Sequence, residues 1–135
     1  MFVFGFEQQL QMKQEILNLR SLEEELIASN IANVNTKNYK SRHINFTNEL
    51  NKIKLKNSTK EMFLESKKTS DKHFSFNIQN NMVQPSIYIS NSNVDQNGNT
   101  VNMNQERMKF VKNSLKYQEE IALLNKEIKN INLVI

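Results

Sequence analysis

The sequence predicts a mainly α-helical protein whose N- and C-terminal helices pair into a coiled-coil-like core. Two long amphipathic patterns support this prediction, one over residues 7–34 and one over residues 103–135. Between them the periodicity fades, and we expect a flexible middle segment with at most a small β element. The expected units are therefore residues 1–35, 36–100 and 101–135. Because only 38% of residues are hydrophobic, part of the stability is expected to come from neighbouring molecules.

The N-terminal helix is expected from residue 7 to about residue 34. Its apolar residues recur at spacings of four, three, three and four, which places them on one helical face. Asn33, Asn35 and Asn38 follow, and asparagine tolerates the left-handed conformation that ends helices. The apolar face consists of Met12, Ile16, Leu19, Leu22 and Leu26.

The C-terminal helix, residues 103–135, has the stronger pattern. Its apolar residues alternate at spacings of four and three along most of the helix, which is typical of a coiled-coil seam. Only Arg107 and Ser114 interrupt the register, and Asn102 with Gln105 resembles a capping box at the start. The predicted seam consists of Phe110, Tyr117, Ile121, Leu124, Ile128 and Ile131.

A second apolar stripe shares the first half of this helix with the seam. A chain with two long helices can cover only one of these stripes internally, so we expect the other to contact another molecule. The residues of this second stripe are Met108, Val111 and Leu115.

The middle segment offers only short signals. Residues 74–78 (FSFNI) alternate like a strand, and residues 87–89 (IYI) predict another after Pro85. Asn97 and Gly98 form a turn signal that leads into the last helix.

The side chains give no pattern for an enzyme, a metal site or a cofactor. With no cysteine, the chain has no disulfide and no thiolate chemistry. His43 and His73 lack metal-ligand spacing, and we interpret both as solvated loop histidines. Four residues between 95 and 106 imitate a calcium loop, but Thr100 occupies the turn position that requires glycine. The glutamates at 23–25 are typical of a solvated helix face.

Charge and hydropathy disfavour nucleic-acid and membrane binding. The net charge is +4, but the 18 Lys and Arg are scattered among 14 Asp and Glu without a dense basic block. No stretch approaches the ~20 apolar residues that a membrane span requires. Residues 1–6 lack a basic lead-in and are too short for a signal peptide, so any export is expected to proceed without cleavage of one.

A specific motif closes the N-terminal helix. Residues 26–40 (LIASNIANVNTKNYK) resemble the N-terminal motif of flagellar axial proteins, which include rod, hook and hook-junction subunits. In that family the motif usually ends with Thr-Pro-Gly-Tyr, and here Lys37 and Asn38 stand where Pro and Gly are expected. The residues assigned to this assembly motif are Ala28, Asn30, Ile31, Ala32, Asn33, Thr36 and Tyr39.

The motif also has a physical interpretation. Ala28 and Ala32, four residues apart, would allow close approach of a second helix. Asn30, Asn33 and Asn35 can bond the backbone groups exposed where the helix ends.

Three further segments are similar to proximal rod proteins of the flagellar basal body. They are residues 42–46, 98–103 and 113–118, and distal rod and hook subunits differ in the last two. The resemblance therefore extends in order from one end of the chain to the other.

The resemblance implies a non-enzymatic, cofactor-free structural subunit of the proximal rod. Such a subunit is exported through the flagellar type III apparatus and assembles in the periplasmic space. One stripe of the C-terminal helix would meet the N-terminal helix, and the other would dock on adjacent subunits. The implied partners are other rod proteins, the membrane-ring junction protein, copies of the chain and, in transit, the export apparatus, with no nucleic acid and no membrane insertion. Another rod subunit, FlgC-like, and a basic coiled-coil nucleic-acid-binding protein remain as alternatives.

Overall fold

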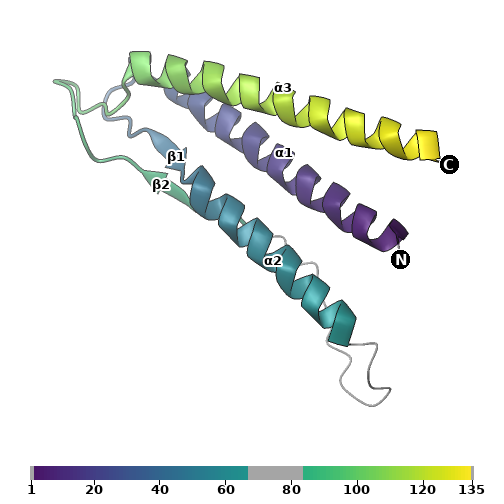
Figure 1. Ribbon diagram of the computed structural model, residues 1–135. Coiled ribbons are helices and arrows are strands. Elements are labelled where there is room, and N and C mark those ends of the chain that lie inside the picture. Colours follow the sequence, from purple (N-terminus) through teal and green to yellow (C-terminus); the bar gives the residue numbers. More distant parts are fainter. Residues whose placement is uncertain (1, 67–83, 135) are drawn as a thin grey trace.

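A computed structural model describes residues 2–66 and 84–134 of the chain. The elements, in chain order, are α1 (Phe2–Ala32), β1 (Arg42–Ile44), α2 (Phe46–Ser66), β2 (Ile87–Ile89) and α3 (Met103–Val134). Helix α1 lies between α2 and α3, and β1 lies beside the C-terminal end of α1 (Figure 1). Helices α1 and α3 run in opposite directions, so the start of α1 and the end of α3 lie at the same end of the molecule (Figure 1).

The prediction of a mainly α protein with paired terminal helices is confirmed. Helix α1 has 31 residues and begins five positions before the expected start, and α3 has 32 residues and begins at Met103, as expected. The side chain of Asn102 accepts the backbone N–H of Gln105 at 3.2 Å, which is the N-terminal cap that the sequence indicated. Within the described residues, no helix is long and apolar enough to cross a membrane.

Helix α2 was not predicted. Its 21 residues lie inside residues 36–100, so that segment holds more than the small β element expected there. The helix begins at a cap, since the side chain of Asn45 accepts the N–H of Asn48 at 3.2 Å and its carbonyl accepts that of Glu49 at 3.0 Å. Its buried apolar residues are too few and its remaining positions too polar to give a clear period in the sequence.

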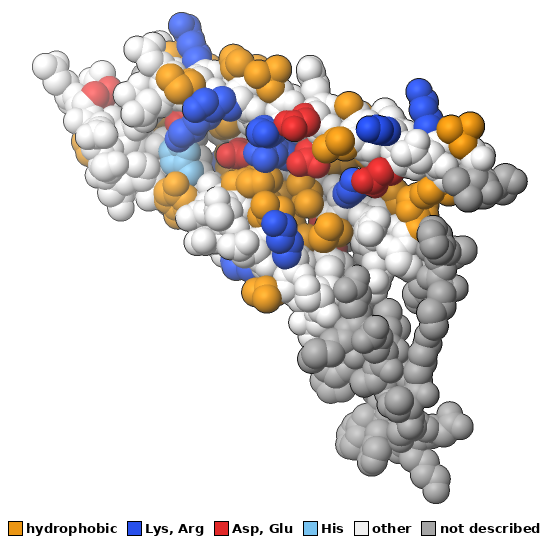
Figure 2. Space-filling view, viewed as in Figure 1, with side chains coloured by type: hydrophobic (Ala, Val, Ile, Leu, Met, Phe, Trp, Pro, Cys, Tyr) orange, Lys and Arg blue, Asp and Glu red, His pale blue; other side chains and the backbone are white. Residues whose placement is uncertain are grey.

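The apolar core lies where α1 meets α2 and β1. Figure 2 shows apolar side chains gathered between α1 and α2. The guanidinium carbon of Arg20 lies 3.6 Å from the centre of the Phe46 ring, so its charge stacks on the aromatic face where α2 begins. The buried core residues are Ile16, Leu19, Leu26, Ile44 and Ile53, with Met12, Leu22, Phe46 and Leu50 packed against them.

The two strands form an antiparallel ribbon in which Arg42 pairs with Ile89 and Ile44 with Ile87. The strand predicted at residues 87–89 is thereby confirmed, whereas the one predicted at residues 74–78 lies outside the described residues. The turn predicted at Asn97 and Gly98 is also present. Gly98 has a φ of +75° and donates its N–H to the carbonyl of Asp95 at 3.0 Å.

Replacing Ile53 by Ala should lower the free energy of unfolding by about 2 to 4 kcal/mol, because it removes buried methylenes from the contact between α1 and α2. Leu55 is the matched control: it lies two residues away in α2, is 67% exposed, and its replacement by Ala should change stability by less than about 0.5 kcal/mol. Urea denaturation of the purified proteins measures both changes. Equal effects of the two substitutions would contradict the packing of α2 on α1.

Candidate assembly surface

The contact between α1 and α3 is polar over the first half of α3. Asn113 is 4% exposed and donates its side-chain N–H groups to the carbonyl of Arg20 at 2.9 Å and to Glu24 Oε2 at 2.6 Å. The hydroxyl of Ser114, which interrupts the predicted seam, donates to Glu24 Oε1 at 2.6 Å. Side-chain hydrogen bonds therefore join the two helices where an apolar seam was expected, and Glu24 is not a solvated residue. The sequence did not indicate Asn113, because a polar residue in a helix is ordinarily exposed.

The predicted seam residues lie on the side of α3 that faces α1, but they are not fully covered. Ile121, Leu124 and Ile131 are half-buried. The other three keep more exposed surface: Phe110 is 40%, Tyr117 36% and Ile128 38% exposed. Farther along the same contact, Lys13 forms an ion pair with Glu127. Their assignment to a coiled-coil seam remains a prediction.

Asn30, from the predicted assembly motif, is fully buried at the junction of α1, β1 and α3. Its amide group faces the backbone of Arg42: the side-chain oxygen accepts the Arg42 N–H at 3.0 Å, and the side-chain nitrogen donates to the Arg42 carbonyl at 2.9 Å. The same nitrogen donates to Glu106 Oε2 at 3.2 Å, and the Tyr39 hydroxyl donates to the Asn30 oxygen at 3.1 Å. One side chain thus satisfies the outer edge of β1 and ties α3 to it.

A second buried amide, that of Asn99, closes the end of α1. Asn99 is 2% exposed, and its side-chain nitrogen lies 2.9, 3.1 and 2.8 Å from the carbonyl oxygens of Asn33, Val34 and Thr36. Its side-chain oxygen accepts the N–H of Val101 at 2.7 Å. The carbonyls of the turn that follows the helix are thereby bonded by a residue from the segment that leads into α3. Sequence reasoning placed Asn99 in a calcium-like pattern and in the segment 98–103 that resembles proximal rod proteins, but it missed this bonding role.

The departure of the motif from Thr-Pro-Gly-Tyr is accommodated in the backbone. Asn38, at the glycine position, has a φ of +60°, a left-handed conformation that glycine adopts freely and asparagine tolerates. Its N–H donates to the carbonyl of Asn97 at 2.9 Å. Gly98 packs on it so closely that an added Cβ would lie 2.4 Å from Asn38 Oδ1. The end of the motif at Asn38 and the turn at Gly98 therefore pack directly against each other, and a side chain at position 98 would clash with Asn38.

The remaining motif residues lie nearer the surface. Ile31 is half-buried, whereas Ala28 and Ala32 are exposed, so neither alanine is covered by α3 of the same chain. The Thr36 hydroxyl donates to Asn33 Oδ1 at 3.0 Å and steadies the end of the helix. Close approach of a second helix to the two alanines remains a prediction, for a helix of another molecule.

The second stripe of α3 lies open. Met108, Val111 and Leu115 are 58%, 57% and 61% exposed, and their spacing places them on one face, opposite the residues that contact α1. Figure 2 shows apolar side chains along the outer side of α3, with basic side chains between them. An exposed apolar row on a helix is typical of a surface that another molecule covers.

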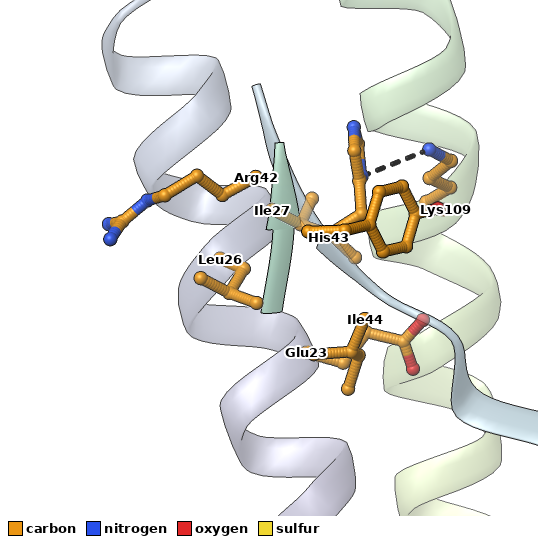
Figure 3. A pocket seen from close by; sticks show the side chains of 8 residues that line it. Glu23, Leu26, Ile27, Arg42, His43, Ile44 and Lys109 are labelled. Atoms are coloured by element: carbon orange, nitrogen blue, oxygen red, sulfur yellow. Dashed lines mark hydrogen bonds between the residues drawn. The ribbon is translucent and has the colours of Figure 1, made fainter. Parts of the chain in front are cut away.

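A shallow pocket lies where α1, the ribbon and α3 meet (Figure 3). His43 in β1 has a side chain only 14% exposed, so it is not the solvated loop residue that we expected. Lys109 Nζ lies 3.4 Å from His43 Nδ1 and can only donate, so Nδ1 accepts and the proton of the neutral ring sits on Nε2, 3.0 Å from the Ser41 hydroxyl. His73 lies outside the described residues. The pocket is lined by Glu23, Leu26, Ile27, Arg42, His43, Ile44, Tyr88 and Lys109.

Burial and charge shift two groups of this pocket. Burial and the Lys109 charge lower the pKa of His43 below its ordinary value of 6.5, although Glu106 opposes the shift. Burial raises the pKa of Glu23 above 4.5, partly offset by Arg20 and Lys109. Among residues 2–66 and 84–134, no group of three or more His, Cys, Asp or Glu could hold a metal ion. The calcium-like pattern serves the backbone instead, since Asp95 Oδ1 accepts the N–H groups of Asn97 and Asn99 at 2.8 and 2.9 Å.

The chain is similar to flagellar basal body rod proteins FlgB from several bacteria. The FlgB protein of Buchnera aphidicola subsp. Acyrthosiphon pisum is 43% identical over 122 residues, which cover 90% of each chain. That of Salmonella typhimurium is 34% identical over 122 residues, covering 90% of this chain and 88% of that protein. That of Proteus mirabilis is 32% identical over 123 residues, covering 91% and 90%. No protein-family model matches the chain.

Replacing Asn30 by Leu should destabilise the fold by about 3 kcal/mol or more, because it leaves the N–H and C=O of Arg42 and the carboxylate of Glu106 buried without this partner. The control is Asn35→Leu, at an exposed position, with an expected change of less than about 0.5 kcal/mol. Urea denaturation distinguishes the two. A mild effect at Asn30 would contradict its role as the junction residue.

Stability should fall as the pH drops below about 6.5, the ordinary pKa of histidine. The folded chain holds the pKa of His43 below that value, so the unfolded chain binds more protons in the window between the two pKa values, and acid favours unfolding. Other groups titrate too, so the readout is the difference between the native protein and His43→Gln, measured by urea denaturation at several pH values. If the variant retained the same pH dependence through this window, the neutral state of His43 would not be the cause.

Proposed function

Because this chain belongs to the FlgB family of flagellar basal body rod proteins, we propose that it is a structural subunit of the proximal rod, which assembles with other rod proteins into the drive shaft for motility. The relatives named above are FlgB proteins, which favours this subunit over a FlgC-like one. The chain would act through assembly, without catalysis and without a cofactor.

The observation that carries this proposal is the open apolar stripe on α3. Met108, Val111 and Leu115 each keep more than half of their surface in water, and within the part of the chain that the structure describes nothing packs over them. Covering such surface on a neighbouring subunit gains about 25 cal/mol per Å². The gain recurs at each copy of a repeating assembly, so a modest stripe can support a mechanically loaded structure.

The axial core would consist of α1 and α3, with the seam residues and the exposed alanines of α1 completing contacts in the assembled rod. Phe110, Tyr117 and Ile128 favour this arrangement, because they border the contact with α1 and remain only partly covered. The partners would be other rod subunits, copies of the chain and the membrane-ring junction protein, after export through the flagellar type III apparatus. We place the assembled subunit in the periplasmic part of the basal body.

Replacing both Val111 and Leu115 by Ser should abolish or strongly reduce motility while leaving the isolated protein folded. Both side chains lie on the face of α3 opposite α1, so circular dichroism should show nearly unchanged helical content. Each truncated residue should weaken a contact between subunits by about 1 to 3 kcal/mol. Recovery of intact rods from cells that carry only the variant measures assembly.

The matched control replaces Lys112 and Lys116 by Ser. Both lysines are exposed, and each directly follows one of the two stripe residues in the sequence. Motility should survive this change. If the Val111 and Leu115 variant unfolded in isolation yet assembled normally, the stripe would belong to the core of the single chain.

A further inference from the structure

The two edges of the β ribbon differ. The outer edge of β1 is closed at Arg42, because Asn30 bonds both the N–H and the C=O of that residue. These bonds also show which residue pairs of the ribbon share backbone hydrogen bonds. Since the backbone groups of Arg42 point away from β2, Arg42 and Ile89 are a pair that does not share hydrogen bonds.

It follows that the backbone groups of β2 alternate in direction. Tyr88 faces His43 within the ribbon, and the N–H of Ser90 donates inward to the carbonyl of Ser41 at 2.9 Å. Ile87 and Ile89 therefore direct their N–H and C=O groups to the outer edge. Within residues 2–66 and 84–134, nothing bonds that edge, and β2 lies on the far side of β1 from α1 (Figure 1).

The side chains of β2 are exposed as well. Ile87, Tyr88 and Ile89 are 45%, 52% and 56% exposed, and this is the full length of the strand. An apolar strand with a free edge is a template for strand addition, and proteins ordinarily blunt such edges with charge, proline or a covering element. Here only the edge of β1 has been covered.

The charges beside β2 are cationic. Lys52 Nζ lies 3.3 Å from the hydroxyl of Ser86, which precedes the strand, and Lys109 lines the pocket that Tyr88 borders. Arg42, opposite Ile89, is exposed and forms no ion pair within the described part of the chain; its side chain extends away from His43 and Lys109 (Figure 3). The carboxylates nearest the two lysines, Glu49 and Glu106, are 3% and 2% exposed, so the accessible charge is positive.

We propose that the outer edge of β2 accepts an extended, acidic segment of another rod subunit by strand addition. The backbone of that segment would pair with Ile87 and Ile89 at a strand spacing of ~4.8 Å. Its apolar side chains would cover Ile87 and Ile89 on one face of the ribbon, and its carboxylates, on the opposite face with Tyr88, would face Lys52 and Lys109. This surface is separate from the α3 stripe. It rests on the proposed function only in identifying the partner as a subunit of the same assembly.

The test uses the full-length protein and a synthetic pentapeptide, acetyl-Val-Glu-Val-Glu-Val-amide. Amide hydrogen exchange followed by NMR should show the Ile87 and Ile89 N–H groups exchanging freely in the protein alone and about tenfold more slowly at saturating peptide. The same peptide with lysine in place of glutamate should give no protection, since it reverses the charge. The original peptide N-methylated at every valine should also give none, since it lacks the valine N–H groups that would face β2.

Two substitutions test the edge from the protein side. Ile89→Pro removes an N–H that points away from β1, so the ribbon should persist while peptide binding weakens by about tenfold or more. Ile89→Val, which keeps the donor, should bind as the native protein does.

Several results would overturn the proposal. They are equal protection by the acidic and N-methylated peptides, unchanged binding by a folded Ile89→Pro variant, and concentration-dependent protection of Ile87 and Ile89 without peptide, which would make a second copy of the chain the occupant. The proposed function is judged separately. If Ile89→Pro supported normal motility while the Val111 and Leu115 variant did not, strand addition would fail and the assembly role of α3 would stand.

Discussion

The requirement that buried polar groups be bonded governs the architecture around the end of α1. Where that helix stops, the carbonyls of the turn that follows and the backbone edge of β1 are bonded by two buried asparagine side chains. Asn30 bonds the backbone of β1 and the carboxylate of Glu106, and Asn99 bonds the carbonyls of the turn that follows α1. Because Asn99 and Glu106 belong to the C-terminal part of the chain, the end of α1 is complete only when α3 is docked.

The two sides of α1 are held by different forces. Toward α2 and β1 the contact is apolar, built around Leu19 and Ile53, and such a contact tolerates small shifts between its parts. Toward α3 it depends on hydrogen bonds of Asn113 and Ser114 to Glu24, which cannot be kept if α3 slips along α1. The apolar side therefore supplies most of the burial, and the polar side sets the register of the terminal helices.

The sequence predicted the elements with strong local signals. The long periodic runs indicated α1 and α3, β-branched residues indicated β2, and Asn97 with Gly98 indicated the turn. Helix α2 was not predicted, because its core-facing residues, such as Leu50 and Ile53, are spaced among polar ones. They can be recognised as one apolar face only once the helix is packed on α1. The burial of Glu106 and Asn113 could not be inferred from the sequence alone. A polar residue becomes a core residue only when a partner distant in the sequence forms a hydrogen bond with it. Among the motif residues, Asn30 was recognised by resemblance and was expected to bond backbone groups at the end of its own helix. Its actual partners, the backbone of Arg42 and the carboxylate of Glu106, could be identified only from the fold.

The antiparallel course of α1 and α3 gives the molecule a direction. The start of α1 and the end of α3 lie together at one end, whereas the asparagine-rich junction and the β ribbon lie at the other (Figure 1). One end is formed by two helix termini and the other by loops and a sheet edge, so the two ends are chemically unlike. A column built by stacking such subunits in one orientation is a polar filament: its growing tip and its base expose different faces, and a molecule that fits one of them has no site on the other.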